Sequence, residues 1–353
     1  MNKLSSIAYY VTDKISSNDI SLSEYVTTDC ILQNKKGREV ASNLPPQPCC
    51  LTRYQRGDVL IANIRPYLKK VWFADIDGGA SSDVLVCRAK EGHSPSFLYA
   101  VLLQDSFFDY VMQGAKGSKM PRGDKEQILR YEMPILSCSE ESIGTFFLNL
   151  DQKIRLNEQI NQNLEAMAKQ LYDYWFVQFD FPNKDGKPYK SSGGEMVWNE
   201  KLKRMIPKEW TNANIYQLAS ISKETVNPQA QPNELFKHYS LPEYDKTGTY
   251  AEEYGIDIQS AKFIVTNNCI LVSKLNPWTS RVICGNRGSN QICSTEFVVW
   301  NPASLKTKGF LFMLAKSAKF IEYCTQGATG TSHSHRRINP ELCLLYTSPS
   351  PRD

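Results

Sequence analysis

The chain has 353 residues, which is long for one ordinary domain and suits two domains joined by a connector. Apolar residues make up 41% and aromatic residues 11%, so the composition excludes an intrinsically disordered protein. The net charge of +4 is a mild basic excess, which is compatible with nucleic-acid binding but does not require it. No apolar run approaches the ~20 residues of a membrane span, and the first residues lack the pattern of a signal peptide. We therefore expect a cytoplasmic protein that does not enter a membrane.

Several kinds of chemistry are excluded by missing motifs. The 10 cysteines and four histidines show no metal-ligand spacing, so we expect reduced, mostly buried thiols and no metal site. The phosphate-loop pattern G-x-x-x-x-G-K-[ST] is absent, and the run Asn43–Pro46 has the wrong order for an amino-methyltransferase motif. The chain is therefore expected to be non-catalytic and to bind no cofactor of its own.

Residues 1–136 predict a first β-rich domain. The apolar runs VLIANI (Val59–Ile64) and SDVLVCRA (Ser82–Ala89) are typical of short strands, and residues 97–113 predict one helix of moderate length. The glycine-rich hexapeptide QGAKGS follows where that helix stops, so we expect its first glycine to end the helix in a left-handed conformation. That role leaves its second glycine and the basic residues that follow unexplained.

Residues 137–182 predict one long helix of about 40 residues and ~60 Å, because nothing interrupts the pattern before Pro182. Apolar residues recur there at coiled-coil spacing, and Asn157 falls on the same seam, as polar residues that fix helix register do. Such a helix needs a partner, and packing on its own domain is the less favoured alternative. The seam consists of Ile143, Phe146, Leu150, Asn157, Ile160, Leu164, Met167, Leu171 and Tyr174. The polar stretch 183–208 is rich in Gly, Lys and Ser and predicts a linker.

Residues 209–343 predict a second domain that repeats the first. GDVLIANIRPYLKKV (57–71) aligns without gaps on NCILVSKLNPWTSRV (268–282), and an acid follows at the same place in both copies, Asp83 and Glu296. The second copy also predicts one helix, over residues 310–326, followed by the hexapeptide QGATGT. Similarity in a fixed register over this length indicates a duplicated domain. The last ten residues, 344–353, look foreign to it.

Basic and polar side chains gather at two places in each copy, namely after the Pro-containing strand end and after the hexapeptide. Arginine and asparagine can read bases with paired hydrogen bonds, whereas lysine mostly meets phosphate. The alternatives are that the aromatic residues of the strand ends pack locally and that the basic residues are solvated surface. The candidate DNA contacts in the first domain are Asn63, Arg65, Tyr67, Lys69, Lys70, Lys116, Gly117, Ser118, Lys119 and Arg122. Those in the second domain are Lys274, Asn276, Trp278, Arg281, Thr329, Gly330, Thr331, Ser332, His333, His335, Arg336 and Arg337.

The segments LNEQINQNLEAMAKQLYDYWFVQFDFP and GKPYKSSGGEMVWNEKLKRMIPKEW resemble the central region of the specificity subunit of type I restriction-modification systems. KLSSIAYYV and QLASISKETV are similar to the two domain starts of that family, and the two hexapeptide segments to its domain ends. The resemblance implies an α+β fold of two β-rich target recognition domains joined by a long coiled-coil-type helix. Each domain would read half of a bipartite, asymmetric target in double-stranded DNA, with the helix setting the spacer.

The same resemblance implies partner subunits. Two modification subunits would dock on the specificity subunit and methylate adenine with S-adenosylmethionine, and restriction subunits would add ATP- and Mg-dependent translocation and cleavage. The chain departs from the family at its end, where LLYTSPSPRD stands in place of a second long helix, so we expect a truncated chain. The alternative function is then a non-productive subunit that pairs with another copy through its central helix or sequesters modification subunits. A self-contained methyltransferase or nuclease is disfavoured by the missing motifs.

Overall fold

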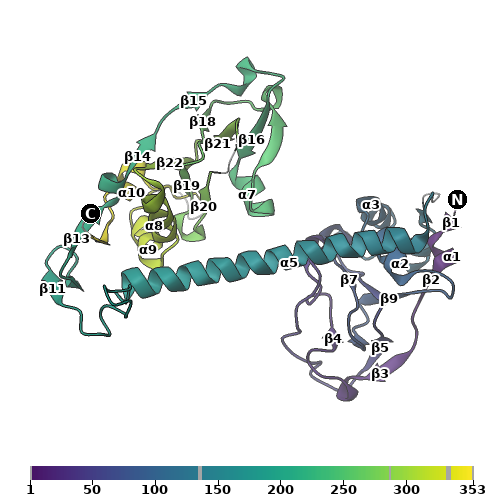
Figure 1. Cartoon of the computed structure of the whole chain (residues 1–353). Coiled ribbons are helices and arrows are strands. Elements are labelled where there is room, and N and C mark those ends of the chain that lie inside the picture. The colour runs from purple at the N-terminus through teal and green to yellow at the C-terminus, as the bar shows by residue number, and fades with distance from the viewer. Residues whose placement is uncertain (1, 134–136, 286–287, 331–334, 352–353) are drawn as a thin grey trace. The chain divides into compact units, whose positions relative to one another are not determined.

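The computed structural model describes residues 2–133, 137–285, 288–330 and 335–351 of the chain. The chain folds into two compact units, Met1–Gln162 and Asn163–Asp353, and one long helix, α5 (Glu140–Tyr172), belongs to both (Figure 1). The predicted α+β class with a long central helix is confirmed. Within the described ranges, no helix is both long and apolar enough to cross a membrane, and no three His, Cys, Asp or Glu side chains cluster as metal ligands. All ten cysteines are free thiols.

The first unit contains two four-stranded sheets. One is antiparallel, in the order β2 (Ala8–Tyr10), β9 (Val84–Ala89), β6 (Val59–Ala62), β7 (Val71–Phe73). The other has the order β3 (Lys14–Ser16), β5 (Cys50–Tyr54), β8 (Gly78–Ala80), β4 (Tyr25–Val26), with β4 parallel to β8. Strand β1 (Asn2–Lys3) pairs with β10 (Glu132–Met133). The helices are α1 (Leu4–Ile7), α2 (Pro95–Leu102), α3 (Asp105–Gln113) and α4 (Lys125–Leu129), with 3-10 turns η1 (Ser17–Asp19), η2 (Gln33–Lys35) and η3 (Pro66–Leu68).

The second unit repeats this topology, with one strand and one helix added. Its antiparallel sheet has the order β14 (Ala219–Ser222), β22 (Phe297–Pro302), β19 (Ile270–Ser273), β20 (Val282–Cys284). Its other sheet has the order β15 (Thr225–Val226), β18 (Lys262–Ile264), β21 (Gln291–Cys293), β16 (Leu235–Tyr239), β17 (Ala251–Tyr254), with β16 parallel to β21. The helices are α6 (Ile215–Leu218), α7 (Leu241–Thr247), α8 (Leu305–Ala315), α9 (Ala318–Gln326) and α10 (Pro340–Leu344), with 3-10 turns η5 (Pro228–Ala230), η6 (Gly255–Asp257) and η7 (Pro277–Thr279). Helix α7 and strand β17 are additions of the second unit.

The antiparallel sheet of each unit is buried on both faces. Along β6, Val59 and Ile61 pack with the helices α2 and α3, whereas Leu60 joins the core that faces the second sheet. Along β19 of the second unit, Ile270 packs with the helices α8 and α9, whereas Leu271 joins the core that faces the second sheet. Burial on two faces explains why these strands read as continuous apolar runs rather than as alternating ones.

The prediction of one helix before each hexapeptide was wrong, because each copy has two. Gln104 takes an extended backbone between α2 and α3, and Ser317 does so between α8 and α9. The Ser317 side chain accepts a hydrogen bond from the Phe320 N–H and so caps the second helix. An apolar pattern that continues in phase across one capping residue does not reveal such a break.

The long helix ends earlier than predicted. Its α-helical geometry stops at Tyr172, one π-helical turn, η4 (Asp173–Val177), follows, and Phe179 has a left-handed φ of 66°. Phe179 is buried edge-on against Trp210, and Phe181 stacks on the same indole at 4.9 Å. Packing around this tryptophan turns the chain out of the helix before Pro182.

The predicted linker 183–208 is folded. Strands β11 (Met196–Asn199) and β12 (Arg204–Pro207) form a hairpin, and Ile206 joins the core around Trp210. Ser191 donates both its backbone N–H and its hydroxyl to the Asp180 carboxylate, at 2.7 and 2.6 Å. The aromatic residues distributed through the polar stretch supply this small core.

The second unit continues past Cys343, where the sequence predicted the domain to end. Strand β23 (Thr347–Pro351) pairs with β13 (Trp210–Asn214), which is the counterpart of the β1–β10 pair in the first unit. Tyr346 packs edge-on against Phe320 at 5.3 Å, as Tyr131 packs against Phe107 at 5.3 Å. The structure therefore places these residues within the repeated fold rather than in a separate tail.

Candidate nucleic-acid interface

The strand ends that the sequence singled out form the same turn in both units. We call residues 63–70 and 274–281 the turns. Each holds a 3-10 helix that begins with proline, and the flanking residues have left-handed backbones: φ is 53° at Arg65, 51° at Lys69, 49° at Asn276 and 51° at Ser280. A left-handed backbone is unfavourable for residues other than glycine and persists only where the surroundings enforce it. Its repetition at equivalent positions indicates a selected geometry.

The basic segments after the hexapeptides fold back as hairpins. We call residues 116–122 and 329–337 the hairpins. Lys116 and Arg122 exchange two backbone hydrogen bonds of 2.9 Å, and Thr329 and Arg337 exchange bonds of 2.9 and 2.8 Å. The hairpins therefore start and end at equivalent residues.

Each hairpin docks on the turn of its own unit. In the first unit the Arg65 N–H donates to the Pro121 carbonyl at 2.8 Å, and the Gly123 N–H donates to the Asn63 carbonyl at 3.1 Å. In the second unit the Asn276 N–H donates to the Arg336 carbonyl at 2.7 Å. The structure thus brings together two groups of candidate DNA contacts that lie some 50 residues apart in the sequence.

The hairpin tips differ in length. Five residues, 117–121, separate the paired residues of the first hairpin, and seven residues, 330–336, separate those of the second. Three of the candidate contacts in the second tip, Thr331, Ser332 and His333, lie outside the described residues. The two units therefore present different loops on one scaffold.

The last residue of each hairpin is an arginine. It pairs with an acid that lies at the same position in both copies of the repeat. Arg122 lies 3.1 Å from the Asp83 carboxylate, and Arg337 lies 2.9 Å from the Glu296 carboxylate. The glutamate raises the pKa of Arg337 through hydrogen bonds and charge. These pairs hold the hairpin to the residue that directly precedes β9 in the first unit and β22 in the second.

Other basic candidates are also held by protein groups. Lys69 and Lys35 both contact the Asp105 carboxylate at 2.7 Å, and their hydrogen bonds lower the pKa of Asp105 to about 2. Lys70 donates to the Thr28 carbonyl at 2.5 Å, and Lys116 lies 3.1 Å from Asp124. Lys35 was not among the predicted DNA contacts, because it lies 28 residues before the first residue of the turn, Asn63. The Lys35 N–H donates to the Lys69 carbonyl at 2.9 Å.

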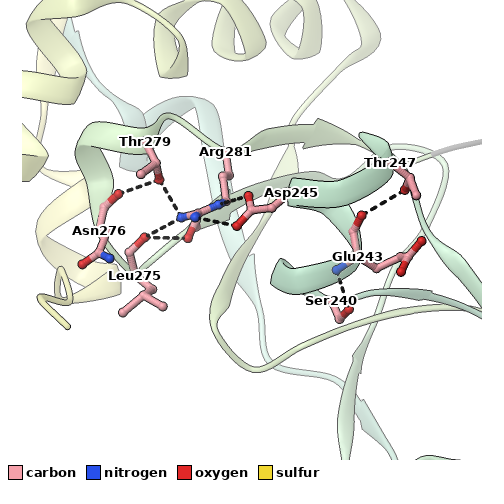
Figure 2. A network of polar contacts seen from close by, with 9 residues as sticks. Ser240, Glu243, Asp245, Thr247, Leu275, Asn276, Thr279 and Arg281 are labelled. Carbon is pink, nitrogen blue, oxygen red and sulfur yellow. Dashed lines mark hydrogen bonds and ion pairs between the residues drawn. The ribbon is translucent and has the colours of Figure 1, made fainter. Parts of the chain in front are cut away.

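In the second unit, Arg281 occupies the position equivalent to Lys70. Its guanidinium binds the Asp245 carboxylate through two hydrogen bonds of 2.5 and 2.8 Å, and it also donates to Thr279 Oγ1 at 2.6 Å (Figure 2). Asp245 lies on α7, which the first unit lacks. The added helix of the second unit thus fixes its turn.

The remaining candidates divide into exposed and enclosed groups. Arg65, Ser118 and Lys119 are exposed, and their side chains make no hydrogen bond or ion pair with another described residue. Tyr67 and Trp278 are 49% and 42% exposed. About half of each of these two aromatic side chains is therefore accessible to solvent. In contrast, the Asn63 amide oxygen is buried, and Asn276 Oδ1 accepts from the Arg336 N–H at 3.1 Å. Lys274 is half-buried, and His335 is exposed.

The glycines of the hexapeptides act differently from the prediction. Gly114 and Gly327 have φ of −101° and −80°, so neither is left-handed. They permit close packing instead, because a Cβ on Gly327 would lie 2.4 Å from Leu342. The left-handed glycine of the first copy is Gly117, with φ of 98°, and a Cβ on Gly330 would lie 2.4 Å from the His335 carbonyl oxygen. The second glycine of each hexapeptide is therefore the one that the hairpin requires.

The apolar seam of α5 is largely exposed. Ile143 packs on the core of the first unit, and Tyr172 and Phe310 pack together in the second. The seam residues that remain 38% to 63% exposed are Phe146, Leu150, Ile160, Leu164, Met167, Leu171 and Tyr174, and Asn157 is exposed among them.

Comparisons with known proteins agree with this architecture, although no protein-family model matches the chain. The chain is 23% identical over 230 residues to the type I restriction enzyme MjaIX specificity subunit of Methanocaldococcus jannaschii, covering 65% of this chain and 49% of that protein. It is 29% identical over 167 residues to the HindI specificity subunit of Haemophilus influenzae, covering 44% of this chain and 36% of that protein. The chain thus spans about half the length, or less, of these relatives.

The crystal structure of a type I restriction-modification system S subunit from M. genitalium is similar over 99% of this chain and 84% of that chain. The TM-score is 0.58 and the sequence identity is 11%, so this likeness concerns the fold. The chain has the fold of a type I specificity subunit. The resemblance drawn from the sequence is therefore confirmed, and the turns and hairpins belong to a specificity-subunit fold.

Proposed function

We propose that the chain is the sequence-reading, non-catalytic subunit of a type I restriction-modification complex in the cytoplasm. Each unit would read one half of a bipartite, asymmetric DNA target, and α5 would set the spacer between the halves. The observation that carries this proposal is the hairpin docked on its turn. It occurs twice at equivalent residues, yet with a different tip length and different exposed side chains. One scaffold with two sets of exposed groups suits two different half-sites.

The exposed seam of α5 supports a docking surface for partner proteins. Apolar side chains in this number on one helix are typical of an interaction surface. We propose that two modification subunits dock there, that they bring S-adenosylmethionine, and that restriction subunits bring ATP and Mg. The chain itself would then need no cofactor.

Selection from a pool of randomised DNA duplexes tests the proposal. The purified chain, alone and with its modification subunit, is expected to enrich two short defined segments separated by a spacer of constant length. The logarithm of the affinity should fall linearly with the logarithm of the salt concentration, because lysines and arginines displace counterions. Enrichment of one contiguous motif, or of none, would count against bipartite reading.

The Asp105→Asn variant is expected to bind any duplex about fivefold more tightly at low salt, because it frees the Lys35 and Lys69 ammonium groups for phosphates. Since the lysines hold the pKa of Asp105 at about 2, the carboxylate is ionised at neutral pH, and the effect should not change between roughly pH 5 and 8. Fluorescence anisotropy across a salt series measures it. The control Asp109→Asn makes the same change of charge on the same helix without releasing a lysine. An equal gain in both variants would refute the role of the pair.

The exposed seam also favours a second candidate, a subunit that pairs with another copy of itself or sequesters modification subunits without forming an active complex. Light scattering distinguishes the candidates by mass. A self-paired chain that excludes the modification subunit would support the second candidate.

A further inference from the structure

In each unit an arginine takes part in the backbone hydrogen bond that joins the turn to the hairpin. This arginine lies on the turn in the first unit and on the hairpin in the second. In the first unit the turn residue Arg65 donates its N–H to the carbonyl of the hairpin residue Pro121. In the second unit the turn residue is Asn276 and the hairpin residue is Arg336. The equivalent backbone contact therefore includes an arginine in both units, once on the turn and once on the hairpin.

Both guanidinium groups are available for a ligand. Neither the Arg65 nor the Arg336 side chain makes a hydrogen bond or an ion pair within the part of the chain that the structure describes, and Arg65 is exposed while Arg336 is half-buried. The other arginines of these surfaces are bound to carboxylates, as shown for Arg122, Arg337 and Arg281. The structure thus separates arginines that hold the scaffold from arginines that remain free.

Both free arginines have a fixed backbone. Arg65 has a left-handed φ of 53°, and its N–H is bound to the hairpin. The backbone of Arg336 is held by two hydrogen bonds to Asn276. Its carbonyl accepts from the Asn276 N–H, and its N–H donates to Asn276 Oδ1 at 3.1 Å. A fixed backbone lowers the entropy lost when a side chain makes a geometrically demanding contact. The Asn276 amide, which could otherwise read adenine, is occupied by this contact.

We propose that Arg65 and Arg336 are the base-reading residues of their units, and that each contacts one guanine of its half-site in the major groove. This inference rests on the proposed function. The five donors of a guanidinium form a planar fork that matches the O6 and N7 acceptors of guanine, which no other base presents together. Lys119 and the paired basic residues then serve phosphate contact and scaffold geometry.

The test repeats the duplex selection with the variants Arg65→Ala, Arg65→Lys and Arg336→Ala. The wild-type chain is expected to select a guanine in each half-site. Arg65→Ala should lower the preference for the guanine in one half-site by roughly ten- to hundredfold and leave the other half-site unchanged, and Arg336→Ala should do the reverse. Arg65→Lys keeps the charge but loses the fork, so it should lose the same preference while retaining most of the affinity.

The control Lys119→Ala removes an exposed charge from the first hairpin and should weaken binding to all duplexes by one common factor. Hydrogen exchange shows whether each variant keeps the wild-type fold. If Arg65→Ala and Arg336→Ala also weaken all duplexes equally, both arginines contact phosphate, and the inference fails while bipartite reading stands. If the wild-type chain selects no bipartite sequence, the proposed function fails and the inference fails with it.

Discussion

The Asp58→Asn variant is expected to lower the free energy of unfolding of the first unit by about 3 kcal/mol. The Asp58 carboxylate is 1% exposed and accepts two hydrogen bonds from the Arg88 guanidinium, at 2.7 and 2.8 Å. It also accepts the Gln55 N–H at 2.8 Å. Replacing Asp58 by asparagine leaves the Arg88 guanidinium without its carboxylate partner where β6 and β9 meet. Removing one partner of a buried ion pair strongly destabilises a fold, because the other charge stays buried. Because the Arg88 side chain is 21% exposed, we expect the lower end of the usual range.

Peptide-resolved hydrogen exchange of the whole chain in increasing urea measures this effect and contains its own control. Position 58 corresponds to Cys269 in the second unit, which has no such ion pair. Peptides from β6 and β9 should therefore lose protection at lower urea in the variant, whereas peptides from β19 and β22 should not change. Equal losses in both units, or no loss in either, would contradict the assignment of this pair to the stability of the first unit.

The Gly330→Ala variant is expected to reduce binding to the second half-site at least tenfold while leaving the free energy of unfolding nearly unchanged. The added Cβ would lie 2.4 Å from the His335 carbonyl oxygen and 3.1 Å from the Arg336 Cα. Both are backbone atoms, so the hairpin has to open, and Arg336 moves with it. A misplacement of about 1 Å is enough to lose a bidentate contact, whose discrimination is worth ~1–3 kcal/mol.

Gly309→Ala is the matched control. A Cβ at position 309 would meet no atom within 4 Å, and the residue lies inside α8. Alanine should stabilise that helix by up to about 1 kcal/mol and leave DNA binding unchanged, because helix interiors favour alanine over glycine. Anisotropy with duplexes altered in one half-site at a time measures the binding. Wild-type affinity of the Gly330→Ala variant would show that the second hairpin does not take part in reading.

The long helix shows which structural features the spacing of apolar residues along the chain can predict. Its coiled-coil spacing predicted the helix correctly, because periodicity depends on neighbours within the same helix. Its end was predicted too late, since Phe179 and Phe181 leave the helix to pack on Trp210, which lies some 30 residues further along the chain. The same limit explains why one helix was predicted where α2 and α3 form two.

The sequence by itself determined the duplication, the α+β class and the two positions in each copy where basic residues gather, because residue spacing repeats in a fixed register. The tertiary structure alone decided that these two positions meet, since α3 and α9 return the chain to the turns. It also decided which basic groups are held and which are free. Arg122 and Arg65 are equally basic in the sequence, but only Arg122 lies beside a carboxylate, that of Asp83 on the neighbouring segment. Charge pairing depends on distance in space, and the order of residues along the chain does not encode that distance directly.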